Sequence, residues 1–452
     1  MAALACITLA ALVSFPQGDG GQAELSSVLS TADKKSLNKR AQDWIKAEFD
    51  YEANSRLRKK RDQAKTRFLT DFRKKGKSDD NVLLKHMGDL LAIFDKAFPY
   101  TKPKGSTPGV LKKFEYETED ATFEYHLLAP RGYAAKNSYR SVLVLAGRED
   151  AAPDSDWAES RDYYEQLWKG SKAEKESILV FPSMIVGDDY DTTPDLTSDL
   201  GQQNEIARIS GVLSPFGEVK RTYRMDRSRT LLDCGVGNSG FGIRLATYFP
   251  SQFAGIILRQ PKAPGRLRLD GLRGMPVLLI DDGESREVCE EIKDALDRIQ
   301  AGKALIIDGT AENLNEQIDT WLLAQVRPNF PIEVTIAPNH DSFKKSHWAQ
   351  IISCEPLDSV SDADRPVINV KADRSKNQIV ITSTNVTEIG LYLNDRLVDL
   401  DKPVEIVVNG ESMEATQFQR SMNTLVDYMR IRAYDPTALY TAYHRFEVAK
   451  SK

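Results

Sequence analysis

Short, continuously apolar runs alternate with segments of helical periodicity between residues 102 and 356. Apolar runs of this length are typical of strands buried on both faces. Strands that alternate with helices predict a mostly parallel sheet covered by helices, and therefore an α/β domain over residues 102–356. The expected strands are 141–145, 178–181, 230–232, 255–258, 276–280 and 332–336. The expected helices are 156–168, 204–223, 240–249, 287–299 and 312–326.

The two flanking segments have different patterns. Residues 24–101 carry apolar side chains at helical spacing and contain no proline between Glu24 and Phe98, which predicts a helical N-terminal region. Residues 357–452 contain several runs that alternate in part with polar residues, together with an Asn409-Gly410 pair suited to a tight hairpin turn. We expect a small β-rich C-terminal module there.

The first 23 residues predict a targeting signal. Residues 2–15 are apolar without interruption, and residues 16–23 are small and polar, with Gly21 and Ala23 fitting a small-x-small cleavage site. Fourteen apolar residues are too few to span a bilayer comfortably. We therefore expect a signal peptide at 1–23 and a secreted or periplasmic protein, although a buried N-terminal segment would also be apolar.

The charge balance limits the partners that the chain can have. Lys and Arg total 61 against 66 Asp and Glu, a net charge of −5, which disfavours a dedicated nucleic-acid binder. The stretch from Asp33 to Lys77 is locally basic, with 16 Lys or Arg against 7 acids. We interpret it as a solvated helix face, and the alternative is a patch for an acidic polymer, a membrane surface or a partner. No specific partner follows.

Nothing in the sequence indicates a cofactor. Beyond residue 23 the cysteines are Cys234, Cys289 and Cys354, an odd and widely spaced set that predicts neither a disulfide framework nor zinc. The acidic stretch 187–195 lacks EF-hand spacing. The glycines in residues 235–240 match the letters of a dinucleotide motif without a clearly spaced ribose-binding acid. We expect no cofactor and no metal.

Several motifs of the middle stretch resemble a known family. Leu-Ala-Pro-Arg-Gly-Tyr at 128–133, the strand that ends in Leu-Ala-Gly-Arg at 145–148, and residues 223–229 and 245–255 look like α/β-hydrolases of the secreted esterase, polyhydroxybutyrate-depolymerase and prolyl-oligopeptidase type. The resemblance implies the α/β-hydrolase fold, with the backbone N–H near Gly147 helping to form an oxyanion hole. Residues 391–403 resemble the β-module attached to some bacterial members.

The resemblance also gives a register for the nucleophile elbow, the sharp turn from strand to helix that exposes a serine. Counting forward from Arg229 and backward from Ala246 by the family's spacing leads both times to Val236, which has no nucleophilic atom. Ser239 offers an alternative three residues later, with Gly240 as an oxyanion donor, or it caps the helix that follows. Cys234 is a weaker candidate, because it is expected to end the strand.

The other positions of a catalytic triad remain open. The loop 281–285 follows the strand that precedes the family acid, and there Glu284 or Asp282 could orient a histidine or could simply form an acidic turn before a helix. His340, beside Asp341, stands where the resemblance puts the general base, and it could equally be a hydrogen-bonded loop residue.

Two functions follow from these observations. The first is a secreted α/β-hydrolase-fold protein that has lost its elbow nucleophile and acts as a binding or interaction module. The alternative is an active serine esterase or peptidase-like hydrolase that uses Ser239 and His340. In either case the expected ligand is a small-molecule ester, a peptide or a polymer.

Overall fold

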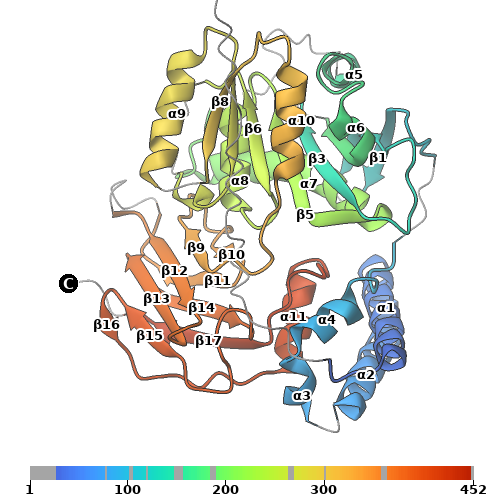
Figure 1. The fold of residues 1–452 in the computed structure, drawn as a ribbon, viewed down its shortest axis with the longest axis vertical. Helices are drawn as coiled ribbons and strands as arrows, with labels where there is room; N and C mark the ends of the chain where they lie inside the picture. The colour runs from blue at the N-terminus through green and yellow to red at the C-terminus, as the bar shows by residue number, and fades with distance from the viewer. Residues whose placement is uncertain are drawn as a thin grey trace, which may run out of the picture.

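A computed structural model describes residues 27–76, 79–100, 105–118, 121–146, 156–183, 190–262, 269–299, 302–357 and 364–448. The expected signal peptide lies outside these residues. The described chain forms two lobes stacked along the long axis of the molecule (Figure 1). We call the part from β1 to α10 the α/β lobe. The second part, which we call the composite lobe, combines the N-terminal helices α1 to α4 with the strands and helix from β9 to β17.

An eight-stranded, mostly parallel sheet forms the α/β lobe, with the strand order β1-β2-β4-β3-β5-β6-β7-β8. Strands β1 and β2 are antiparallel additions at one edge, and the strands from β4 to β8 in this order are parallel. The predicted fold class, an α/β-hydrolase-like sheet covered by helices, is confirmed. The strands are β1 (Lys112–Glu117), β2 (Thr122–Leu128), β3 (Tyr139–Leu145), β4 (Ser177–Pro182), β5 (Met225–Cys234), β6 (Gly255–Arg259), β7 (Val277–Asp281) and β8 (Ala304–Asp308).

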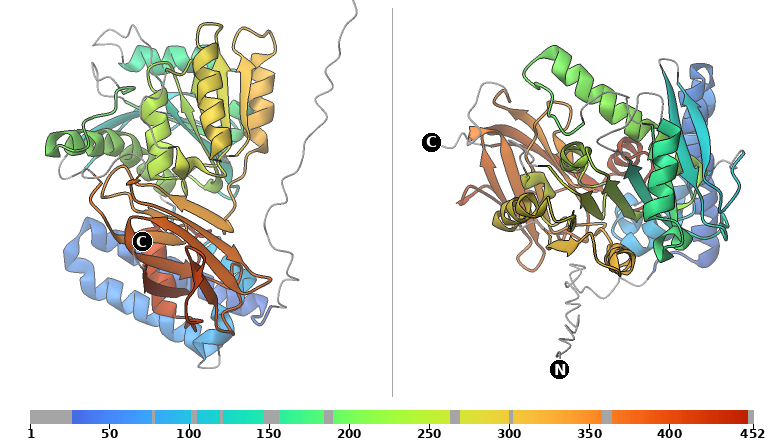
Figure 2. Two further views of the ribbon diagram at one scale, coloured as in Figure 1. Left: turned by 90° about the vertical axis from the view of Figure 1, so that its left-hand side faces the viewer. Right: turned by 90° about the horizontal axis from the view of Figure 1, so that it is seen from above.

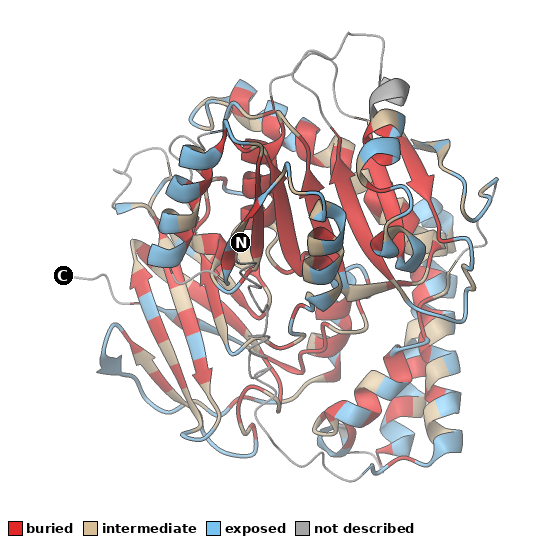
Figure 3. Cartoon of the chain, turned by 45° about the horizontal axis from the view of Figure 1, so that its top comes forward, coloured by how far each residue is buried: buried red, intermediate tan, exposed pale blue. Residues whose placement is uncertain are grey.

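Helices cover both faces of this sheet, which explains why its central strands are apolar throughout. Side chains of α7, α8 and α9 join one hydrophobic cluster, and those of α5, α6 and α10 join the cluster on the opposite face. The central strands are accordingly buried along their length (Figure 3). The helices are α5 (Asp156–Leu167), α6 (Lys172–Glu176), α7 (Asp199–Thr222), α8 (Ser239–Tyr248), α9 (Arg286–Arg298) and α10 (Leu314–Ala324).

One expected strand of the parallel sheet belongs elsewhere. The run predicted at 332–336 forms β9 (Glu333–Ile336), which pairs antiparallel with β12 in a different sheet. The parallel sheet instead ends with β8, which was not predicted. Both are short apolar runs, and only long-range pairing distinguishes them. The division of strands between the sheets therefore falls before Glu333 rather than near residue 356.

Two antiparallel-rich sheets form the C-terminal part of the composite lobe. One has the order β10-β11-β14-β17, and the other has the order β16-β15-β13-β12-β9. Helix α11 (Met422–Ile431) precedes the last strand. The strands are β10 (Lys345–Ser346), β11 (Ala349–Cys354), β12 (Val367–Asp373), β13 (Gln378–Thr384), β14 (Val386–Leu393), β15 (Glu405–Val408), β16 (Glu411–Ser412) and β17 (Ala442–Glu447).

The N-terminal helices pack against this C-terminal part rather than standing alone (Figure 2). Their buried side chains and those of β9 to β17 belong to one hydrophobic cluster. Trp44 is central to it, because its ring stacks on Phe68 with centroids 5.4 Å apart and meets the edge of Tyr434 at 5.7 Å. The helices are α1 (Thr31–Ala53), the 3-10 turn η1 (Ser55–Leu57), α2 (Arg58–Lys75), α3 (Asp80–Leu84) and α4 (Met87–Phe94).

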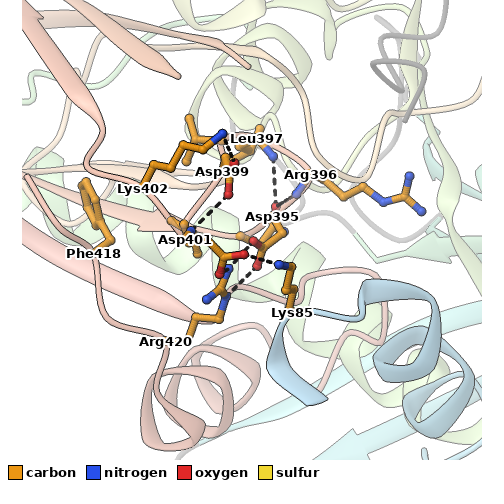
Figure 4. A network of polar contacts seen from close by, with 12 residues as sticks. Lys85, Asp395, Arg396, Leu397, Asp399, Asp401, Lys402, Phe418 and Arg420 are labelled. Carbon is orange, nitrogen blue, oxygen red and sulfur yellow. Dashed lines mark hydrogen bonds and ion pairs between the residues drawn. The ribbon is translucent and has the colours of Figure 1, made fainter. Parts of the chain in front are cut away.

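A polar network also joins the two ends of the chain (Figure 4). Lys85, just after α3, forms an ion pair with Asp401, which also accepts from Arg420 at 2.9 Å. Arg420 donates from Nε and Nη2 to both carboxylate oxygens of Asp395, at 2.9 and 2.5 Å. Charged contacts thus accompany the shared core that holds the helices to the C-terminal sheets.

Candidate functional site

The turn from β5 into α8, residues 235–238, is the structural counterpart of a nucleophile elbow. We call it the elbow turn. Strand β5 ends at Cys234, and helix α8 begins at Ser239. Gly237 has a φ of +82°, which a residue with a side chain rarely adopts. Val236 is partly exposed on this turn. The side chain at the position predicted for the nucleophile therefore has no group able to attack.

Ser239 lies below the surface, with 1% of its side chain exposed. Its hydroxyl donates to Oδ1 of Asp191 at 3.3 Å and accepts from the backbone N–H of Lys262 at 3.2 Å. Ser239 is also the first residue of α8, with Asn238 at the cap position, so the alternative that Ser239 caps the helix is wrong. The Ser239 hydroxyl thus bonds to a carboxylate and to a backbone N–H, and among the described residues it makes no hydrogen bond to an imidazole.

The backbone N–H of Gly240 donates to the same Asp191 oxygen, at 2.7 Å. Asp191 therefore satisfies the first turn of α8, where a carboxylate is favoured by the free N–H groups and the helix dipole. A Cβ added at Gly240 would lie 2.7 Å from the carbonyl oxygen of Asp191, so the two backbones are in close contact. The N–H of Gly240, a proposed oxyanion donor, thus already has an acceptor within the chain. The other proposed donor, near Gly147, lies outside the described residues.

A buried ion pair fixes the segment that carries Asp191. Arg244 on α8 donates from Nε to Glu205 on α7 at 2.8 Å, and neither side chain is exposed. Arg244 also donates from Nη2 to the carbonyl of Tyr190 at 3.2 Å. The ring of Tyr190 meets that of Phe241 edge to face, with centroids 5.1 Å apart. These contacts hold Asp191 against the start of α8.

His340 is not at the elbow turn. It follows β9 in the composite lobe, and its ring packs on Phe343, which in turn stacks on Tyr248 at the last turn of α8. The Ser239 hydroxyl bonds to Asp191 and Lys262, whereas Nδ1 of His340 accepts from Ser342. The expected Ser239–His340 hydrogen bond is therefore not formed among the described residues.

The local contacts of His340 suit a loop residue. Only 5% of the side chain is exposed, and Nδ1 accepts from the backbone N–H of Ser342 at 3.0 Å. Burial lowers the pKa of His340 below its ordinary value, which favours the neutral ring. Nε2 has no hydrogen-bond partner in the described part of the chain.

The proposed triad acid has no histidine to orient. Glu284 is exposed, and its backbone N–H donates to Asp282 at 3.1 Å. The Asp282 carboxylate also accepts from the N–H of Ser285 at 3.0 Å, just before α9. This is the acidic turn before a helix that the sequence left open as an alternative. Among the described residues no hydrogen bond joins Ser239, His340 and Glu284.

Cys234 is equally unsuited to catalysis. It is fully buried, and burial raises the pKa of its thiol, which keeps the sulfur protonated. Its Sγ lies 2.1 Å from where a Cβ on Gly242 would stand. Cys234 therefore fills the space between β5 and α8 that the missing side chain of Gly242 leaves.

The described part of the chain offers neither a cluster of metal ligands nor a membrane-spanning helix. Over the described ranges there is no group of three or more His, Cys, Asp or Glu side chains placed to hold a metal ion. Part of the acidic stretch 187–195 lies outside them, and Asp195 accepts from Thr197 within the loop. Among the helices described, none is long and apolar enough to cross a membrane.

No protein-family model and no curated protein matches this chain. It is similar in structure to a thermostable esterase, at a TM-score of 0.33 and 17% identity over 48% of this chain and 63% of that one. For a ferulic acid esterase from Anaeromyces mucronatus the TM-score is 0.34, with 14% identity over 50% and 94% of the two chains. For an S-formylglutathione hydrolase from Staphylococcus aureus it is 0.34, with 10% identity over 49% and 98%. The similarities cover about half of this chain.

Sequence patterns did not single out the residues that organise the elbow turn. Asp191, Glu205 and Arg244 come from a loop and two helices, and their interactions depend on tertiary contacts. The one available signal was Arg244 itself, a charged residue within the apolar pattern of a helix expected to be buried. A buried arginine requires a carboxylate partner, but the sequence does not identify it.

Proposed function

We propose that the α/β lobe is a non-catalytic member of the hydrolase fold and that the protein acts as a binding or interaction module. The observation that carries this proposal is the contact between Asp191 and the start of α8. Hydrolysis at an elbow needs an exposed nucleophile, a base within hydrogen-bond reach and free N–H donors for the oxyanion. Here Ser239 and Gly240 both contact Asp191, and His340 makes no hydrogen bond to Ser239 in the described part of the chain.

Export of the protein belongs to the same proposal. A secreted or periplasmic location rests on the apolar residues 2–15 and the small residues that follow them. The two functions weighed from the sequence differ most sharply in the chemistry of Ser239, so the experiment addresses that residue.

The test is covalent labelling of the full chain with a fluorophosphonate, followed by intact-mass measurement. We expect no adduct, and we expect equal hydrolysis of p-nitrophenyl acetate by the wild type and by Ser239→Ala. Ser285→Ala is a matched control, because the Ser285 hydroxyl is also buried and also donates to carboxylates. A stoichiometric adduct lost in Ser239→Ala and slowed in His340→Ala would establish the active serine hydrolase instead.

A further inference from the structure

The junction between the two lobes collects cationic side chains from four separate parts of the chain. Lys220 comes from α7, Arg227 from β5, Arg327 from the segment after α10, and Arg432 from the residue after α11. We call these four residues the junction cluster. Three of them, Lys220, Arg227 and Arg432, are partly exposed, whereas only 7% of Arg327 is exposed. The cluster therefore combines one buried guanidinium with three partly exposed cationic side chains.

A series of printed contacts brings these side chains together. Lys220 donates to the side-chain oxygen of Gln252 at 2.7 Å, and Arg432 donates to the hydroxyl of the adjacent Ser251 at 2.5 Å. Arg227 donates to the carbonyl of Ala433, next to Arg432, at 3.3 Å.

Arg327 joins the series from the other side. Its Nη2 donates to the backbone carbonyl of Arg227 at 3.4 Å. The positive charges of Arg227, Arg432 and Arg327 all act on Lys220, whose pKa is held well below its ordinary value by burial first and by Arg227 next. The four cationic groups are thus close enough to repel one another.

Negative charge at the junction is scarce. Asp435 is the carboxylate whose charge acts on Lys220, beside the positive charges of Arg227, Arg432 and Arg327. One Asp435 oxygen already accepts from the N–H and hydroxyl of Thr437, at 2.9 and 2.7 Å. The other lies 4.0 Å from Nη2 of Arg327. Among the described residues, the structure records no ion pair for Lys220, Arg227 or Arg432 within 4.0 Å.

A donor at the same place has no acceptor. Nε of Arg327 is buried and makes no hydrogen bond to any described residue. A buried N–H group without a partner costs about 1–3 kcal/mol, and more for a charged group. One kind of ligand, an anion with several oxygen acceptors, would balance the positive charge of the junction cluster and accept from Nε of Arg327. Arginine suits such a ligand because its planar fork matches phosphate geometry.

We propose that the junction cluster binds a small, multiply charged oxyanion, namely inorganic phosphate or the phosphate group of a small molecule. The ligand oxygens accept from the guanidinium groups and from Lys220, and the bound charge links side chains of both lobes. This site is separate from the elbow turn and does not depend on whether Ser239 is catalytic.

The experiment measures phosphate binding by the full chain, using calorimetric titration and the melting temperature at constant ionic strength. Inorganic phosphate, glycerol phosphate and chloride are compared. We expect saturable binding of phosphate and no effect of chloride. Tighter binding of glycerol phosphate would identify an organic ligand, and equal binding would identify the free ion.

Variants separate specific binding from the general stabilising effect of phosphate on proteins. Arg432→Gln, which keeps a polar group at a partly exposed position, should weaken phosphate binding at least about tenfold, and Arg327→Met should do so more strongly. Arg445→Gln is the matched control, since Arg445 lies on the edge strand β17 and pairs with Glu388 on β14. Equal phosphate-dependent shifts in the wild type and all three variants, or no saturable binding by the wild type, would overturn the proposal.

Discussion

The elbow turn and the junction cluster both gather charged side chains around a helix end or a strand end, but their charges are balanced differently. At the elbow turn, Glu205 and Arg244 are paired one to one, and Asp191 satisfies the start of α8. At the junction, four cations face one carboxylate, Asp435, and a buried donor of Arg327 has no acceptor.

The difference shows that the position of a site in the fold and its need for a ligand are separate properties. The elbow turn lies where the sequence predicts a nucleophile, yet the Ser239 hydroxyl and the Gly240 N–H already have partners within the chain. The junction exists only because the composite lobe packs beneath the sheet, and there polar groups are left over. Unsatisfied buried groups are a better indication of a ligand than position in a fold, because function is attached to sites rather than to folds.

The largest expected effect comes from removing one partner of the buried Arg244–Glu205 ion pair. Arg244→Met leaves Glu205 buried without a counter-charge, and we expect a loss of about 3–5 kcal/mol in the free energy of unfolding. Urea denaturation provides the measurement. The control Arg445→Met removes an exposed ion pair and should cost about 0–1 kcal/mol. Similar losses in the two variants would mean that the elbow turn is not held by its buried pair.

A smaller effect is expected from Asp191→Ala. The substitution removes the acceptor of the Gly240 N–H and of the Ser239 hydroxyl, so we expect a loss of about 1–3 kcal/mol. Asp195→Ala is the control, because that exposed carboxylate bonds only to Thr197 and its neighbours within the loop. Unchanged stability of Asp191→Ala in urea denaturation would show that Asp191 does not hold the elbow turn.

The last expected effect concerns pH beside Arg432 of the junction cluster. Lys345 lies over the rings of Tyr392 and Tyr428, and burial followed by the charge of Arg432 lowers the pKa of Lys345 to about 7. An unfolded lysine has a pKa of about 10.4. Between these values the unfolded chain binds more protons, so this group makes stability rise with pH.

We therefore expect the wild type to gain stability between pH 7 and pH 9 relative to Lys345→Met, whose pH dependence should be flatter. Urea denaturation at the two pH values gives the comparison. Parallel pH dependences in the two proteins would show that Lys345 stays charged in the folded protein between pH 7 and pH 9.

The sequence predicted the α/β architecture because buried parallel strands are apolar along their whole length, as in 141–145 and 276–280. It also located the turn near Val236, because the family spacing counted from Arg229 and from Ala246 leads to that position. It misassigned the last strand, since β8 is an edge strand with Leu305 exposed and β9 is an equally short apolar run. The expected role of His340 rested on that assignment, and the histidine instead follows β9 in the composite lobe.

Neither charged region could be predicted from the sequence, because its members are far apart along the chain. Asp191 precedes its partner Gly240 by a whole helix and strand. The junction cluster extends from Lys220 to Arg432, and no local motif connects these residues. Such contacts arise only when tertiary packing brings the elements together.

The shared core of the composite lobe has a consequence for biosynthesis. Trp44 on α1 leaves the ribosome early, whereas Tyr434, against which it packs, is made near the end of translation. At ordinary elongation rates the apolar faces of the first helices wait on the order of tens of seconds for their partners. During that interval the nascent chain needs protection from aggregation, and a polypeptide that stops before the last strands would leave its first helices without a core.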